Sequence, residues 1–207
     1  MLSIPETFRT PRGLTVEGAS PALLKDLLEA YKYEIERRDP HAWDGFRPGH
    51  SRQQILDRFS AEELHCPEEL VVWWEWSDGH PMMYPRGLRN VPIGLDRTLS
   101  LYREDRDGMF ELLPGPEWVR ILGQGRRAST AVFCGQGQDL PLVAFLDVEE
   151  GLGPGRLPDH CALSLCTPVT WLLTSLAEGW VAFNESRQRW SLAYDEVPLE
   201  WRLTQLL

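Results

Sequence analysis

Apolar side chains recur every three to four residues in the first hundred positions of the chain, which is the spacing of amphipathic helices. The clearest case spans residues 21–38, with Ser20 as a suitable N-cap and Pro21 at the first helical position. Its buried face is predicted to hold Leu23, Leu24, Leu27, Leu28, Tyr31 and Ile35. Residues 1–19 read as an irregular lead-in and residues 39–50 as a loop, because both are rich in proline and glycine.

Two further helices follow this loop. One begins at Ser51, whose capping-box partner is Gln54. The next begins at Pro67, carries three tryptophans and ends at residues 77–79. A short helix with Asp96 as its N-cap is expected from there to Arg103.

Later in the chain, short apolar or alternating runs separated by glycines replace the helical spacing. Such runs are typical of strands in one sheet, and they occur at residues 118–122, 131–134 and 142–146. A hairpin turn at residues 135–139 is expected to join the last two. A helix capped by Thr167 and closed by Gly179 follows, then strands at 180–183 and 189–194 and a terminal helix from Pro198.

This order of elements predicts an α+β fold. We expect a single mixed or mainly antiparallel sheet, flanked by helices, in one domain over residues 20–207. The composition agrees with a folded body, since 43% of the 207 residues are hydrophobic and 25% are charged.

Charge and the lack of targeting signals narrow the functional classes. No apolar run approaches the about 20 residues that cross a bilayer, and the N-terminus lacks the pattern of a secretory signal, so we expect a cytoplasmic protein without membrane contact. The 31 acidic residues exceed the 21 basic ones and give a net charge of −10, which argues against direct nucleic-acid binding. The same charge would attract a basic protein partner, although it also serves solubility.

The candidate chemistry gives no firm enzyme signature. Free, buried thiols are expected at all four cysteines, namely Cys66, Cys134, Cys161 and Cys166. No metal is expected, because structural zinc needs ligand pairs about two to four residues apart and a second pair is missing. No cofactor is expected either, since the glycine clusters lack phosphate-loop and dinucleotide patterns. A thiol- or metal-dependent hydrolase using Cys161, Cys166 and His160 is the enzyme-class alternative.

Acidic and aromatic clusters supply the binding candidates. The pairs at 62–63 and 68–69 are interpreted as capping and solvated carboxylates at helix starts, where the helix dipole favours negative charge. Asp147, Glu149 and Glu150 instead lie beside a predicted strand and in a glycine-rich loop, a common place for binding residues. Helical steps of about 100° turn Trp74 away from Trp73 and Trp76, so at least one ring faces either a surface or a second core.

The segment from Cys66 to Gly79, CPEELVVWWEWSDG, resembles the core signature of the SUKH superfamily. That superfamily contains fungal cell-wall assembly regulators and many bacterial immunity proteins. Its element order is similar over residues 20–194, including the runs at 99–102, 118–121 and 189–190 and the hairpin that ends at Asp147.

The resemblance implies a non-catalytic protein-binding module, whose bacterial relatives commonly neutralise a cognate toxin, often a nuclease. The alternative is a regulator or scaffold that binds housekeeping proteins, as the fungal relatives do. The candidate partner contacts are Trp74, Asp78, His80, Asp147, Glu149 and Glu150.

Overall fold

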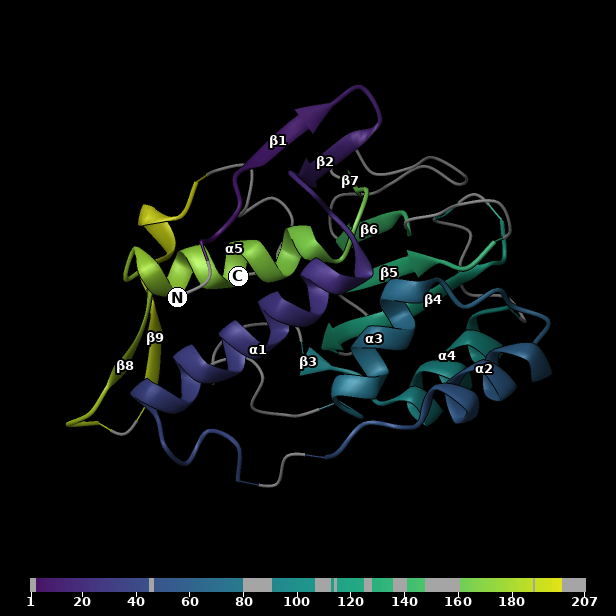
Figure 1. The fold of residues 1–207 in the computed structure, drawn as a ribbon, viewed down its shortest axis with the longest axis horizontal. Helices are drawn as coiled ribbons and strands as arrows, with labels where there is room; N and C mark the ends of the chain where they lie inside the picture. The colour runs from purple at the N-terminus through teal and green to yellow at the C-terminus, as the bar shows by residue number, and fades with distance from the viewer. Residues whose placement is uncertain are drawn as a thin grey trace.

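The computed structural model describes residues 3–44, 47–79, 91–106, 113, 115–124, 128–135, 141–147, 161–187 and 189–198. Within these ranges the chain forms five α-helices, a seven-stranded sheet and a two-stranded sheet, which confirms the α+β class. Figure 1 shows the helices gathered against the larger sheet and the smaller sheet at the far end of α1 and α5.

The larger sheet is mixed and mainly antiparallel, as predicted. In spatial order its strands are β1 (Thr7–Thr10), β2 (Gly13–Val16), β7 (Cys161–Ala162), β6 (Val143–Asp147), β5 (Ala128–Phe133), β4 (Trp118–Gln124) and β3 (Val91–Pro92). Only β2 and β7 pair in parallel among the described strands. The predicted strands β4, β5 and β6 are confirmed as neighbours, while most of the turn expected at 135–139 lies outside the described residues.

The first 19 residues differ from the irregular lead-in that we expected. They contain the β1–β2 hairpin, in which Leu14 and Val16 are buried. Gly13 allows this arrangement, because its φ of 143° suits glycine and a Cβ there would lie 2.8 Å from the carbonyl oxygen of Cys161. The strands are only four residues long, so their alternating pattern is weak beside the surrounding turn residues.

The helices are α1 (Pro21–Arg38), α2 (Arg52–Ala61), α3 (Glu68–Trp76), α4 (Leu95–Arg106) and α5 (Cys166–Ala177). Two predicted caps are confirmed: the Ser20 hydroxyl accepts from the N–H of Leu23, and Ser51 forms a reciprocal capping box with Gln54. Helix α1 packs against both α3 and α5, α2 packs against α3, and α4 covers β4. None of the helices in the described ranges is both long and apolar enough to cross a membrane.

Two helix boundaries differ from the sequence predictions. Helix α4 starts at Leu95, so Asp96 lies in its first turn rather than at its N-cap. Helix α5 starts at Cys166, so Thr167 lies inside it. In both cases a carboxylate far away in the sequence caps the start of the helix, as described below, and at α5 the nearby Ser164 hydroxyl also accepts from the Cys166 N–H.

The last two strands also differ from a single-sheet arrangement. β8 (Val181–Asn184) and β9 (Arg189–Leu192) pair only with each other among the described strands. β8 begins shortly after α5 ends at Ala177, so the small sheet lies at the end of α5 that points away from β7 (Figure 1). Residues 194–196 form a 3₁₀ turn instead of extending β9, and the predicted terminal helix lies beyond the described residues.

Candidate functional site

The predicted site residue Asp78 lies where α3 ends and the chain turns toward α4. Ser77 is the C-cap of α3, and Gly79 has a φ of 75°, in the left-handed region that favours glycine. A Cβ at Gly79 would lie 2.7 Å from the backbone nitrogen of Gly94. The end of α3 therefore packs directly, backbone against backbone, on the residues that precede α4.

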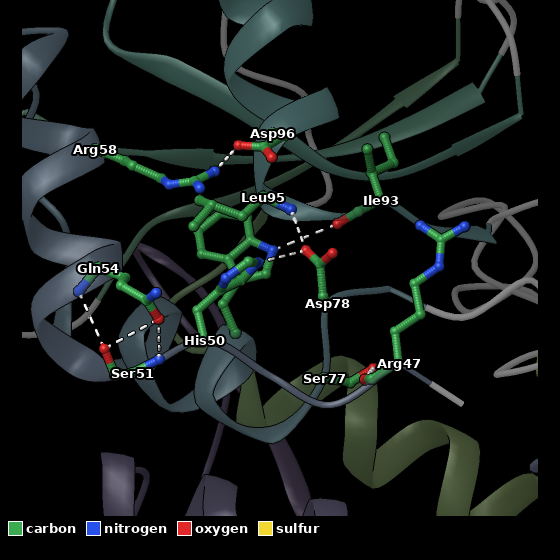
Figure 2. A network of polar contacts seen from close by, with 11 residues as sticks. Arg47, His50, Ser51, Gln54, Arg58, Ser77, Asp78, Ile93, Leu95 and Asp96 are labelled. Carbon is green, nitrogen blue, oxygen red and sulfur yellow. Dashed lines mark hydrogen bonds and ion pairs between the residues drawn. The ribbon is translucent and has the colours of Figure 1, made fainter. Parts of the chain in front are cut away.

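The Asp78 carboxylate caps α4. Its Oδ1 accepts a hydrogen bond of 2.8 Å from the backbone N–H of Leu95, the first residue of that helix (Figure 2). Gly94 leaves room for this contact, since a Cβ there would lie 3.0 Å from the same oxygen. A carboxylate at a helix N-terminus also interacts favourably with the helix dipole.

His50 approaches the same carboxylate from the loop before α2. Its Nε2 lies 2.9 Å from Asp78 Oδ1, and both side chains are about four-fifths buried (Figure 2). The Nε2–H bond is not directed at that oxygen, so the contact is an electrostatic one that becomes an ion pair when the ring is protonated. The same oxygen of Asp78 thus caps α4 and lies against the His50 ring.

The loop that carries His50 is fixed to the end of α3 through its backbone. The His50 N–H donates to the carbonyl of Trp74 at 2.9 Å, and the Asp78 N–H donates to the carbonyl of Arg47 at 3.3 Å. A side chain at Gly49 would collide with the carbonyls of Trp74 and Glu75. The His50 N–H satisfies the carbonyl of Trp74 in the last turn of α3, which the helix itself leaves open.

Trp74 is not a surface residue, which corrects its prediction as a partner contact. Its side chain is 0% exposed, packs on Phe59 with ring centroids 5.5 Å apart, and donates from Nε1 to the Ile93 carbonyl at 3.4 Å. Trp73 is also buried, whereas Trp76 is partly buried in an edge-on contact with Trp43. Both buried tryptophans belong to the same main core, because α3 is covered on several sides, so neither a surface nor a separate second core is needed to place them.

The other candidate contacts are only partly described. Asp147 ends β6, but its side chain is outside the description, and so are residues His80, Glu149 and Glu150. Strand register nevertheless places Val91, Gly123, Ser129 and Leu146 in one row across β3, β4, β5 and β6. Three strand spacings make this row roughly 14 Å wide. The chain therefore enters β3 after residue 90 and leaves β6 after Asp147 at the same end of the sheet.

The four cysteines are buried thiols that form no disulfide, in agreement with the prediction. Burial raises the pKa of the Cys66 and Cys134 thiols well above the usual range. Burial, followed by the nearby Glu69 carboxyl, raises the pKa of Cys166 to about 11. Thiolate is the form that attacks substrates and binds metals, and these three sites disfavour it. His160, the third member of the hydrolase alternative, lies outside the described residues.

The interpretation of Glu69 as a solvated carboxylate is wrong. The side chain is 0% exposed, and its two oxygens accept from the Ser164 hydroxyl and from the Leu165 N–H, each at 2.6 Å. It therefore caps α5, whose N-cap Leu165 provides no side-chain acceptor. The neighbouring Glu68 fits the original interpretation, since it lies at the surface and pairs with Arg52. Glu62 caps the end of α2, not its start, and pairs with Arg103 of α4.

A surface groove that the sequence did not indicate runs between α1 and α5. Its volume is about 520 Å³, and its lining includes Ile4, Ala30, Tyr33, Arg37, Leu173 and Ala177. Tyr33 is 61% exposed, more than any other large hydrophobic side chain in the described ranges. Tyrosine and arginine beside a groove are the residue types that dominate protein interfaces.

Comparisons with known proteins add no relative: no protein-family model matches the chain, and no curated protein matches its sequence.

Proposed function

We propose that the chain is a non-catalytic, SUKH-like protein-binding module that neutralises a cognate toxin. The observation that carries the proposal is the arrangement of the signature-like segment at residues 66–79. Its aromatic helix is buried, and its closing Ser77-Asp78-Gly79 joins that helix to α4 through a cap and a close backbone contact. Such roles explain why a loosely patterned family would keep this tripeptide.

The proposed contact surface lies at the end of the sheet where β3 begins and β6 ends. Asp147 ends β6, and Glu149 and Glu150 follow it in the sequence, so these residues would give the proposed surface negative charge. A chain with a net charge of −10 attracts a basic partner before the two proteins touch. A nuclease with a basic active face would be such a partner. Electrostatic attraction of this kind raises the association rate more than it raises the final affinity.

The direct test is titration of the purified protein with toxin domains encoded beside its own gene, followed by calorimetry and inhibition of toxin activity. We expect a stoichiometric complex whose association slows as salt concentration rises. Failure to form a complex with any of these toxin domains would overturn the immunity function.

The surface is mapped with two variants that change net charge equally. Glu149→Gln with Glu150→Gln should slow association several-fold, because it removes two charges from the proposed surface. Asp26→Asn with Glu29→Gln removes two exposed charges from α1 and should leave association almost unchanged. Equal effects from both pairs would mean that only net charge matters and that the surface is misplaced.

The groove between α1 and α5 favours the second candidate, a regulator or scaffold that binds other cellular proteins. A partner held there should be lost on Tyr33→Ala but retained on Phe8→Ala, which removes the other exposed large aromatic side chain of the described ranges. Co-purification with cellular proteins in the absence of any toxin, lost only in the Tyr33 variant, would favour this function over immunity.

A further inference from the structure

Three helix N-termini meet at the buried Glu69 carboxyl. Glu69 itself lies in the first turn of α3, and it accepts hydrogen bonds from Ser164 and Leu165 at the start of α5. The Cys166 thiol links the third helix, since Sγ lies 3.5 Å from the carbonyl oxygen of Ser20, the N-cap of α1, and 3.9 Å from Glu69 Oε1. The Glu69 side chain therefore lies where the starts of α1, α3 and α5 come together, in contact with α5 directly and with α1 through Cys166.

Two opposing effects act on the charge of this carboxyl. Burial away from water disfavours the ionised form, whereas the hydrogen bonds from Ser164, Leu165 and Cys166 favour it. Burial is the larger effect and raises the pKa of Glu69 to about 7. Helix N-termini provide a positive potential, but without a balancing cation it does not offset full burial.

The charged groups around the junction do not neutralise Glu69. On α3, Glu68 points outward to Arg52, which lowers the pKa of Glu68. On α5, the Cys166 thiol has a raised pKa and stays neutral. The contribution of α1 is the Ser20 carbonyl, and the first turn of α1 contains no acidic residue. The pKa values of two adjacent carboxyls on one helix are thus shifted in opposite directions.

We propose that Glu69 makes this three-helix junction pH-responsive: the neutral carboxyl holds α3 against the starts of α1 and α5, and ionisation weakens that packing. When the carboxyl is neutral, its O–H donates a hydrogen bond to Ser164 Oγ across the same 2.6 Å contact, Ser164 Oγ also accepts from the Cys166 N–H at 2.9 Å, and the other carboxyl oxygen still accepts from the Leu165 N–H. After ionisation the same oxygens must carry an unpaired buried charge, which is costly in free energy. The inference stands independently of the proposed toxin binding.

The sign of the effect follows from linkage. A carboxyl with a raised folded-state pKa contributes its full stability below the unfolded-state value of 4.5 and loses it as pH rises through about 7. Across that window the unfolding equilibrium constant should rise by about 300-fold relative to a chain without the group. Between pH 5 and pH 8 the same relation gives about 70-fold.

The test compares urea unfolding of the natural chain, Glu69→Gln and Glu68→Gln at several values between pH 5 and pH 8. The amide introduced by Glu69→Gln keeps an oxygen for the Leu165 N–H and an N–H₂ for Ser164, so it imitates the neutral carboxyl. We expect the natural chain and the Glu68 variant to lose stability together as pH rises, by about 70-fold relative to Glu69→Gln. A Glu69 variant with the pH dependence of the natural chain would overturn the proposal.

A second measurement needs no folded variant. Carbon-13 NMR of the Glu69 carboxyl in the natural chain should give a midpoint near 7, and the protection factors of the Leu165 and Cys166 amides, corrected for base-catalysed exchange, should fall above it. A midpoint near the ordinary value of 4.5, or amide exchange that does not follow the titration, would contradict the inference.

Discussion

Replacing Asp78 tests whether this residue is mainly a cap for α4 or an ion-pair partner of His50. Asp78→Ala removes the acceptor for the Leu95 N–H and also the negative charge beside His50. Asp78→Asn removes only the charge, because asparagine caps helices about as well as aspartate. The two variants therefore separate the contributions of the two contacts.

The expected magnitudes differ clearly. Losing an N-cap costs about 1 kcal/mol, and a poorly solvated Leu95 N–H without an acceptor adds about 1 kcal/mol more. The His50 contact contributes less than about 1 kcal/mol, because the two side chains remain 20% and 24% exposed and can exchange the contact for water. We therefore expect Asp78→Ala to lower the free energy of unfolding by about 2 kcal/mol, and Asp78→Asn by less than about 1 kcal/mol.

Urea unfolding gives the free energies of both variants, and thermal unfolding gives their melting temperatures; both are followed by circular dichroism and tryptophan fluorescence. For a chain of this length, the alanine variant should melt about 4 to 8 °C below the natural protein, and the asparagine variant only about 2 °C below it. Equal losses in the two variants would show that charge, not capping, is the main contribution. An alanine variant as stable as the natural protein would show that the cap contributes nothing measurable.

The remaining predictions concern the surroundings of α3. Gly49→Ala should lower stability by more than about 2 kcal/mol, since its Cβ would collide with backbone carbonyls, whereas Gly18→Ala, in open space with a φ of 69°, should cost only about 1 kcal/mol. Comparable losses would contradict the close contact. Trp74→Phe should cost about 2 kcal/mol in urea unfolding, through lost volume and the lost bond to Ile93, and it should not weaken partner binding if Trp74 is buried as described. All four thiols should react with a thiol reagent far more slowly in native than in urea-unfolded protein; fast native labelling would show that they are accessible.

Local signals in the sequence were enough for most helices. Ser20 and the Ser51–Gln54 pair were identified as caps because a local cap acts over about three residues, which a short sequence window contains. The strands β4 to β6 followed in the same way from short apolar runs between glycines. The β1–β2 hairpin was missed because its pairing with β7 depends on a residue near position 162.

The errors at α4 and α5 have one physical cause. Each helix is capped by a carboxylate distant in the sequence, 17 positions before Leu95 in one case and 96 positions before Leu165 in the other. Neighbouring residues with capping chemistry, Asp96 and Thr167, drew the prediction instead. Sequence periodicity cannot reveal which distant oxygen satisfies a helix end, because that pairing exists only in the folded chain.

Both distant caps come from the segment that resembles the SUKH signature, and this gives the segment a structural explanation. Glu69, at the start of α3, caps the start of α5, and Asp78, just past the end of α3, caps the start of α4. The buried tryptophans between them fill the core. Helix α3 therefore sets the positions of two other helices as well as its own. Glu69 and Asp78 thus serve folding in this chain, so residues that recognise a partner are better sought where β3 begins, where β6 ends and along the α1–α5 groove.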